Sequence, residues 1–331
     1  MSVANVPKAE LHCHLEGAAR PELVRSLARD HGIDLAHVFD ADGRYRAGDF
    51  STFLATYDEV VAVFREPDDY RALARDHYTW LAEQGAIYAE VFVSPSHASR
   101  LGFGWPTLVE AVALGMREAR EATGGAGVGI EGRIIATGVR HYGPLDVEAA
   151  AETVAAHPHP MVTGFGLAGD ERQHHAADFS RPFQIAREAG LGLTAHAGEH
   201  MGPESVVHAL DQLHVTRIGH GVRAVEDPVL VDRIVAERIV LEVCPGSNVA
   251  LGVYDTPADH PFGQLWDAGA RVTLNSDDPP FFHTDLANEY AFARDVAGLA
   301  EADLLEVTRT ALEAAFVDEA TRGSLLARLG T

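Results

Sequence analysis

Eight short β-rich segments recur along the chain, and most of them are separated by stretches with helical periodicity. The segments are 9–15 (AELHCHL), 86–93 (AIYAEVFV), 132–139 (GRIIATGV), 162–167 (VTGFGL), 192–197 (GLTAHA), 217–222 (RIGHGV), 239–244 (IVLEVC) and 271–276 (RVTLNS). Strands that alternate with helices are joined by right-handed parallel crossovers. Eight such units match a closed (β/α)8 barrel, the TIM barrel, which needs about 250 residues or more. The sequence therefore predicts an α/β fold of this type.

The chain is long enough for one such barrel or for two smaller domains. It has 331 residues and contains no internal repeat, linker or low-complexity tract, so we expect a single domain over residues 1–331. The first crossover is the exception in length, because about 70 residues separate the first two segments. Its helically spaced apolar residues are Phe53, Leu54, Tyr57, Val60, Val61 and Phe64. They predict extra helices after the first strand, which either pack against the barrel as a pair or cover its mouth.

The charge balance limits the partners that the protein can have. The chain carries 49 acidic and 26 basic residues, a formal net charge of -23. Because nucleic acids and anionic membranes bind surfaces rich in Lys and Arg, we expect neither as a partner and favour a small molecule. The first residues lack the basic start and apolar core of a signal peptide, and no apolar run reaches about 18 residues, so we expect a cytoplasmic protein. These features leave the oligomeric state open.

Two histidines, His12 and His14, flank Cys13 in the first segment. On a strand, residues i and i+2 face the same side about 6.6 Å apart, so the two imidazoles could converge on one metal ion; the alternative is a pair of hydrogen-bonded core histidines. With 18 histidines in the chain, an H-x-H pair is expected roughly once by chance. The same spacing recurs at His157 and His159, but the prolines in HPHP exclude a central strand, and we expect a solvated loop there.

Further polar residues stand where other predicted strands end. His196 and Glu199 belong to TAHAGEH at the end of the fifth segment, and His220 lies near the end of the sixth. Asp277 and Asp278 follow the eighth. Because the ends of barrel strands surround one mouth, these residues are expected to meet. The predicted cluster is His12, His14, His196, Glu199, His220, Asp277 and Asp278.

Three imidazoles and a carboxylate suit zinc or a similar divalent ion, and a catalytic site leaves a further position for water. Such an ion lowers the pKa of that water toward neutrality and makes hydroxide available. A closed structural site needs only four ligands, so the remaining polar groups are expected to handle protons and hold a substrate. We expect the neighbouring His200 to be a solvent-exposed residue on a helix.

Other chemistries are excluded or remain as alternatives. Lys8, the only lysine, precedes the first strand and belongs at the bottom of the barrel, which excludes lysine-bridged metal pairs and Schiff-base aldolases. The H-x-E and P-C-x-x-C signature of cytidine-type deaminases is absent. Cys13 and Cys244 are too few for a disulfide framework, and we expect buried free thiols. Hydrolysis of another bond, such as a phosphoester, and metal or purine binding without catalysis remain as alternatives.

Six ordered motifs span nearly the whole chain: PKAELHCHLEG, GFGLAGDE, TAHAGE, RIGHGV, LEVCPGSNVAL and TLNSDDPP. With them the chain closely resembles the adenosine and adenine deaminase family of the amidohydrolase superfamily. The resemblance implies one Zn²⁺ per chain, with the ligands His12, His14, His196 and Asp277. It implies the catalytic residues Glu199, His220 and Asp278, and the substrate contacts His14, Glu16, Gly169 and Asp278.

The family pattern also implies what these residues do. Glu199 would protonate purine N1 while hydroxide attacks C6, and His220 would orient or deprotonate the water. Asp278 would bond N7, and the backbone N–H of Gly169 would contact N3.

The choice of purine depends on smaller differences. Adenosine deaminases carry an Asp that meets the ribose 5'-hydroxyl, where this chain has Glu16, one methylene longer. NSDDP and CPGSNVAL are similar to the adenine deaminase branch, whereas LAGDE and RIGHGV are similar to the adenosine branch. The resemblance thus favours zinc-dependent hydrolytic deamination of adenosine, and of 2'-deoxyadenosine, to inosine and ammonia in purine salvage. Free adenine or another 6-aminopurine nucleoside is the alternative substrate.

Overall fold

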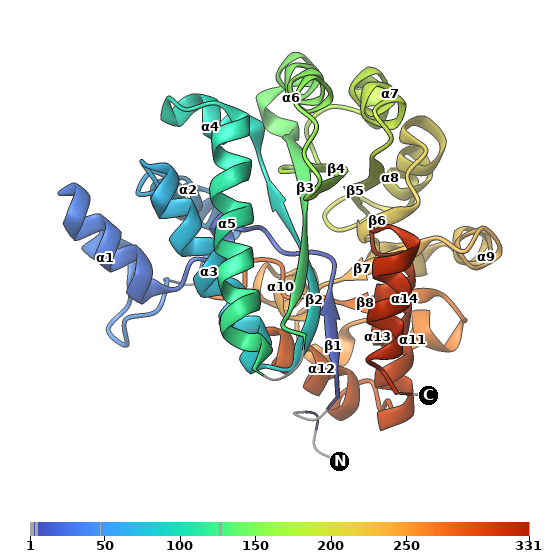
Figure 1. The fold of residues 1–331 in the computed structure, drawn as a ribbon. Coiled ribbons are helices and arrows are strands. Elements are labelled where there is room, and N and C mark those ends of the chain that lie inside the picture. Colours follow the sequence, from blue (N-terminus) through green and yellow to red (C-terminus); the bar gives the residue numbers. More distant parts are fainter. Residues whose placement is uncertain (1–2, 4–5, 47, 126–127, 331) are drawn as a thin grey trace.

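The structure, a computed structural model, describes residue 3 and residues 6–46, 48–125 and 128–330. Eight strands form one sheet, and each pairs in parallel with the next along the chain. They are β1 (Lys8–Glu10), β2 (Ala86–Val93), β3 (Glu131–Val139), β4 (Val162–Ala168), β5 (Gly192–Ala197), β6 (Arg217–His220), β7 (Val240–Val243) and β8 (Arg271–Leu274). Helices surround these strands in Figure 1, and the predicted (β/α)8 barrel is confirmed.

The first strand is shorter than its β-rich segment and ends at Glu10. Beyond it, side chains replace the backbone ladder between the first and last strands: Leu11 N donates to the side chain of Asn275, and Ser276 N donates to that of Glu10. The extended backbone then closes the barrel through hydrogen bonds from His14 N to Asp277 O and from Asp277 N to His12 O. The two histidines therefore stand on the seam where the barrel closes.

The helices begin and end with ordinary signals. Eight of the fourteen α-helices have Pro at their first or second position, where the missing N–H costs nothing. They are α1 (Pro21–His31), α2 (Phe50–Val61), α3 (Pro67–Glu83), α4 (Pro95–Leu101), α5 (Trp105–Gly124), α6 (Pro144–Ala156), α7 (Ser180–Glu188), α8 (Pro203–His208), α9 (Pro228–Ala236), α10 (Pro245–Ala250), α11 (Phe262–Asp267), α12 (Leu286–Asp295), α13 (Glu301–Ala314) and α14 (Glu319–Ala327). Both described ends of the chain lie near the lower edge of Figure 1.

Of the two arrangements left open for the first crossover, the structure places predicted apolar residues of α2 at the mouth. α3 packs along α5 on the outside of the barrel. α2 instead brings Phe50, Phe53, Leu54 and Tyr57 to the wall of the pocket at the barrel mouth. Of the helices α1, α2 and α3 in this segment, α2 thus covers the mouth and α3 packs on the outside.

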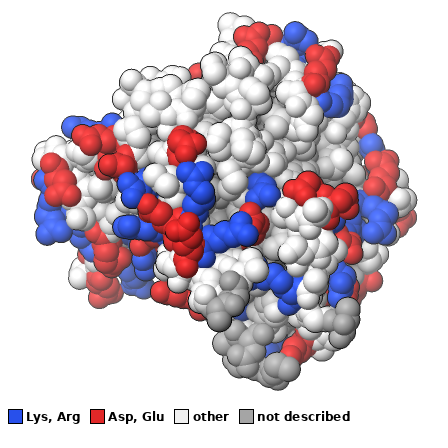
Figure 2. Space-filling view, viewed as in Figure 1, with Lys and Arg blue, Asp and Glu red and all other residues white. Residues whose placement is uncertain are grey.

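The remaining predictions concern buried and surface charges. Lys8 starts β1, and its amine donates to the backbone carbonyls of Val3, Val6 and Gln84, far from any role at the mouth. No described helix is long and apolar enough to cross a bilayer. On the face shown in Figure 2, basic side chains lie beside acidic ones. The surface ion pairs of the structure include that of Arg322 with Glu319.

Candidate active site

The residues predicted to converge do meet at the carboxyl ends of the strands. The cluster consists of His12, His14, His196, Glu199, His220, Asp277 and Asp278. All but His12 line one pocket, and the centre of the His12 ring lies 4.4 Å from that of His196. Glu16 and Gly169 line the same pocket. The structure therefore brings every predicted site residue together.

The four expected metal ligands lie at the distances that one ion requires. Nε2 of His196 lies 3.1 Å from Nε2 of His12 and 3.3 Å from Nε2 of His14. Oδ1 of Asp277 lies 3.5 Å from Nε2 of His12 and 3.3 Å from Nε2 of His14. Atoms bound about 2.0–2.1 Å from a tetrahedral zinc ion lie about 3.4 Å apart. Asp277 Oδ1 is also buried without a hydrogen-bond partner among the described residues, so a cation would satisfy it. The residues fit a mononuclear metal site.

The backbone after the strands is shaped for this convergence. His220 and Asp277 adopt left-handed conformations with φ of 60° and 64°. Such conformations cost about 1–3 kcal/mol for residues other than glycine and cluster at functional sites. Close approach also requires a glycine, because a Cβ on Gly219 would lie 2.7 Å from Cε1 of His12. The left-handed backbone of His220 and Asp277, and the absence of a side chain at Gly219, therefore allow the site residues to converge on one point.

Hydrogen bonds from outside the cluster orient its members. Glu242 Oε2 lies 2.8 Å from Nδ1 of His12, and Nδ1 of His196 donates to Leu167 O at 3.0 Å. With Nδ1 protonated, each ring presents the lone pair of Nε2 to the centre. The hydroxyl of Ser247 donates to Asp277 Oδ2 at 2.6 Å and leaves Oδ1 free. These contacts preorganise the ligand atoms.

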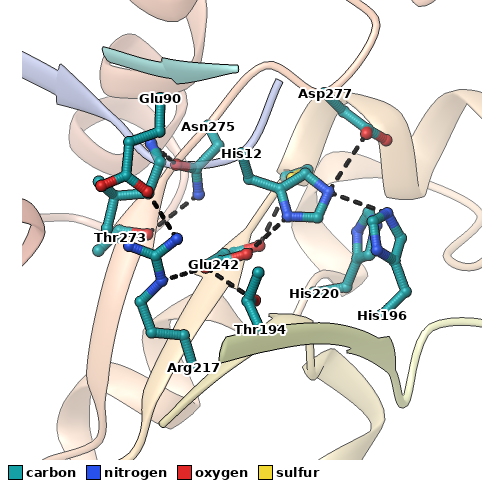
Figure 3. A network of polar contacts seen from close by, with 12 residues as sticks. His12, Glu90, Thr194, His196, Arg217, His220, Glu242, Thr273, Asn275 and Asp277 are labelled. Carbon is teal, nitrogen blue, oxygen red and sulfur yellow. Dashed lines mark hydrogen bonds and ion pairs between the residues drawn. The ribbon is translucent and has the colours of Figure 1, made fainter. Parts of the chain in front are cut away.

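Glu242 belongs to a buried charge network inside the barrel (Figure 3). Its Oε1 lies 2.6 Å from Nε of Arg217, whose other branch donates to Glu90 Oε2 at 2.7 Å. Burial opposes the charge of Glu242, but Arg217 and His12 outweigh burial and lower its pKa. Glu90 also accepts from Phe316 N, and Arg217 donates to Ala314 O. Sequence reasoning missed these residues, although charged side chains within apolar strand segments were a visible signal.

Replacing Glu242 with Gln is expected to weaken metal binding and to lower kcat, each by roughly 10–100-fold, because the carboxylate that orients His12 is lost. Titration of the metal-free variant with Zn²⁺ would measure the first effect, and a deaminase assay the second. Glu237→Gln is the matched control, since Glu237 makes only an exposed ion pair with Arg233. Unchanged zinc affinity in Glu242→Gln would contradict the orienting role.

The turn that carries Glu199 is built on a second carboxylate, Glu171. The Glu171 side chain accepts the backbone N–H groups of Gly198, Glu199, His200 and Met201 at 2.5–3.1 Å. Glu171 is the last residue of the motif GFGLAGDE, which predicted no role for it. The four bonds fix the path of the chain after β5 and hold the Glu199 side chain in the pocket.

Glu199 and Asp278 have the environment of protonated carboxyl groups. Burial, followed by the charges of Asp277 and Glu171, raises the pKa of Glu199 well above its usual value. Burial and the adjacent Asp277 do the same to the pKa of Asp278. Glu199 Oε2 lies 3.6 Å from Nε2 of His220. A raised pKa favours the protonated form of both carboxyl groups, and a protonated carboxyl group can donate a hydrogen bond to a bound molecule.

Glu16 is the opposite case, an ionised carboxylate in the same pocket. It lies in a 3-10 helix (Glu16–Ala18) directly after the first strand segment, and its Oε1 accepts from Nδ1 of His97 at 3.0 Å and from the hydroxyl of Tyr70 at 3.2 Å. Burial alone would raise the pKa of Glu16, but His97 and these hydrogen bonds outweigh it and lower the pKa. Both donors use Oε1, which leaves Oε2 for a ligand.

Three lesser predictions have mixed outcomes. The prediction for His200 is wrong: it lies in a bend before α8, its side chain is only 16% exposed, and its ring packs 4.5 Å from that of Phe50 because α2 covers this side of the mouth. His157 and His159 lie in and after the bend that follows α6, and neither lines the pocket. Cys13 and Cys244 are buried free thiols, as predicted.

A TIM barrel whose strand ends gather three imidazoles and a carboxylate around one point, beside two carboxyl groups of raised pKa, has the site of a metal-dependent amidohydrolase. The family model described as adenosine deaminase matches residues 7–331. The chain belongs to this family of hydrolytic deaminases, as the sequence motifs predicted. A relative from Agrobacterium fabrum, named adenine deaminase, is 55% identical over 98% of both chains.

Solved structures resemble the whole chain. The crystal structure of an adenine deaminase from Arthrobacter aurescens is 31% identical, with a TM-score of 0.90 over 98% of both chains. An amidohydrolase from Burkhoderia ambifaria, solved with bound Zn, is 27% identical, with a TM-score of 0.86 over 99% of this chain and 90% of its own. The similarity therefore extends over the complete barrel and the helices that cover it.

Proposed function

We propose that the protein is a zinc-dependent adenine deaminase that converts free adenine and water to hypoxanthine and ammonia. The observation that carries this proposal is the full-length similarity to proteins named adenine deaminase, in sequence and in structure. These relatives favour the alternative substrate of the sequence analysis, free adenine, over adenosine. The proposal keeps two expectations of the sequence analysis, a small purine substrate and a site for one metal ion.

One zinc ion per chain, with His12, His14, His196 and Asp277 as ligands, would polarise a water molecule and supply hydroxide at neutral pH. The residues around it divide the remaining work. Attack on C6 moves electron density onto ring nitrogen N1, and the protonated Glu199 gives its proton to that atom as the charge develops. The interaction strengthens only in the transition state, which is where a contribution to kcat requires it.

The other edges of the ring are held by two further groups that line the pocket. The protonated Asp278 donates to N7, and the backbone N–H of Gly169, at the end of β4, donates to N3. A Cβ on Gly17 would lie 1.6 Å from Asp278 Oδ1, so the chain beside Glu16 is pressed against this carboxyl group. With N7 and N3 so placed, the intervening N9 points toward the Glu16 wall.

This orientation gives Glu16 a role that suits the free base. Free adenine carries a proton on N9 and can donate it to the ionised carboxylate of Glu16. A nucleoside carries ribose on N9 and lacks this donor. A hydrogen bond to a charged group contributes about 1.5–3 kcal/mol, or about 10–150-fold in kcat/KM.

The test compares kcat/KM for adenine, adenosine and 9-methyladenine by the change in ultraviolet absorbance on deamination. We expect adenine to be preferred over 9-methyladenine by at least about 10-fold, and Glu16→Gln to reduce this ratio. Glu22→Gln, on the exposed face of α1, is the matched control. Faster turnover of adenosine than of adenine would overturn the proposed function. Equal turnover of adenine and 9-methyladenine would overturn only the role of Glu16.

A further inference from the structure

A chain of three hydrogen bonds leads from the pocket residue His220 to the backbone at the start of α11. Phe262 N donates to Nδ1 of His260 at 3.2 Å. Nε2 of His260 lies 3.1 Å from Oδ1 of Asn248, and Nδ2 of Asn248 lies 3.2 Å from Nδ1 of His220. The three side chains are buried, and none of the roles described above uses Asn248 or His260.

The backbone at one end of this chain fixes the direction of every bond in it. A backbone N–H can only donate, so Nδ1 of His260 is an acceptor and its ring proton is on Nε2. That proton is donated to Oδ1 of Asn248, so the amide NH₂ of Asn248 faces His220. In the reverse direction, the N–H of Phe262 would face a protonated Nδ1.

The tautomer of His220 follows from these bonds. Its Nδ1 accepts from Asn248, and the ring therefore carries its proton on Nε2. Nε2 faces Glu199 at 3.6 Å, and the His220 ring lies 4.9 Å from that of His12. A ring nitrogen of His220 lies within 4.8 Å of ligand atoms of His12, His196 and Asp277. A protonated Nε2 has no lone pair for a metal ion, so this tautomer separates His220 from the ligands.

We propose that Asn248 and His260 are positioning residues that hold His220 as its Nε2–H tautomer, so that His220 donates a hydrogen bond to the oxygen of the attacking water. This rests on the proposed hydrolytic function and decides between the two roles expected for His220. At Nε2 the ring orients the water and does not take its proton. The assignment concerns the position of one proton and no change of charge.

Nuclear magnetic resonance of protein labelled with ¹⁵N-histidine tests the tautomer without turnover. Long-range ¹H–¹⁵N correlation distinguishes Nδ1–H from Nε2–H, and the His220→Gln spectrum identifies the signals of His220. In the zinc-loaded wild-type protein we expect the His220 proton on Nε2. A proton on Nδ1 would overturn the proposal. Because no substrate is needed, this result is independent of whether adenine is deaminated.

Asn248→Asp tests the cause of the tautomer with an isosteric change. A carboxylate accepts from both histidines, so the proton of His220 is expected to move to Nδ1, and kcat to fall roughly 10–100-fold while KM changes little. Asn288→Asp makes the same change on the exposed face of α12 and should alter neither the spectrum nor kcat. Retention of Nε2–H and of kcat in Asn248→Asp would overturn the proposal.

His260→Gln provides a second variant should Asn248→Asp fail to fold. Without the imidazole, the orientation of the Asn248 amide is no longer fixed by Phe262 N. Both tautomers of His220 are then expected in the spectrum, with a smaller fall in kcat than in Asn248→Asp. His157→Gln, at an exposed position after α6, is the control. An unchanged single Nε2–H signal would show that His260 has no positioning role.

Discussion

Glu199→Gln is expected to lower kcat for adenine by about 10³-fold while the metal remains bound. Glutamine keeps the size of the side chain but cannot give a proton to N1, and general acid catalysis typically contributes about 10²–10⁴-fold. The raised pKa of Glu199, caused by burial and by the neighbouring charges of Asp277 and Glu171, provides the protonated form that this step needs. The measurement is kcat and KM for adenine together with the zinc content of the purified variant.

Glu204→Gln is the control for this experiment, since Glu204 lies exposed in the first turn of α8, five residues further along the chain. It should behave as the wild-type protein. If the protein bound a metal or a purine without catalysis, neither the wild-type protein nor either variant would deaminate adenine. Turnover by Glu199→Gln within a few fold of wild type would assign the proton transfer to another group.

Asp277→Asn is expected to abolish most deamination through loss of the metal. Asp277 supplies the only carboxylate among the four expected ligands, and its Oδ1 has no other partner among the described residues. Electrostatic activation by a metal is worth several kcal/mol, so kcat should fall by about 10³-fold or more. Metal analysis of the variant and a zinc titration of the chelated wild-type protein measure the effect, with one equivalent of zinc expected to restore full activity.

Asp232→Asn, at an exposed position in α9, should keep both zinc and activity. Two results would contradict the mononuclear assignment. Full activity after complete metal removal would exclude a metal-dependent mechanism. Two ions per chain, found reproducibly, would instead favour the alternative hydrolase of another bond.

The fold and the residues that line the site could be predicted because both follow from local sequence patterns. Alternation of β-rich and helical segments specified the barrel, and barrel geometry placed residues as distant as His12 and Asp277 at one mouth. The residues that contact the site residues from outside the pocket could not be predicted in this way. Glu242, Ser247 and Asn248 contact the site residues His12, Asp277 and His220 through side-chain hydrogen bonds, and such pairings depend on register and rotamer rather than on residue spacing.

Two further features, the end of the first strand and the choice of substrate, could not be predicted from local sequence patterns, for different reasons. The first strand ends at Glu10 because the side chains of Glu10 and Asn275 replace backbone bonds at the barrel seam, which no propensity describes. In the proposed binding mode, the choice between adenine and adenosine depends on the few atoms near N9. There, Glu16 differs from the residue in adenosine deaminases by a single methylene group, and its pairing with His97 appears only in three dimensions.

The buried network of Glu90, Arg217 and Glu242 connects His12, at the barrel mouth, to the backbone near the end of α13. Through it, Ala314 at the end of α13 and Phe316 after it are connected to the carboxylate that contacts His12, one of the expected metal ligands. A chain shortened before Ala314 would leave a guanidinium and a carboxylate facing each other in a dry interior without their backbone partners. We therefore expect removal of the last two helices to disturb the position of His12 as well as the stability of the barrel.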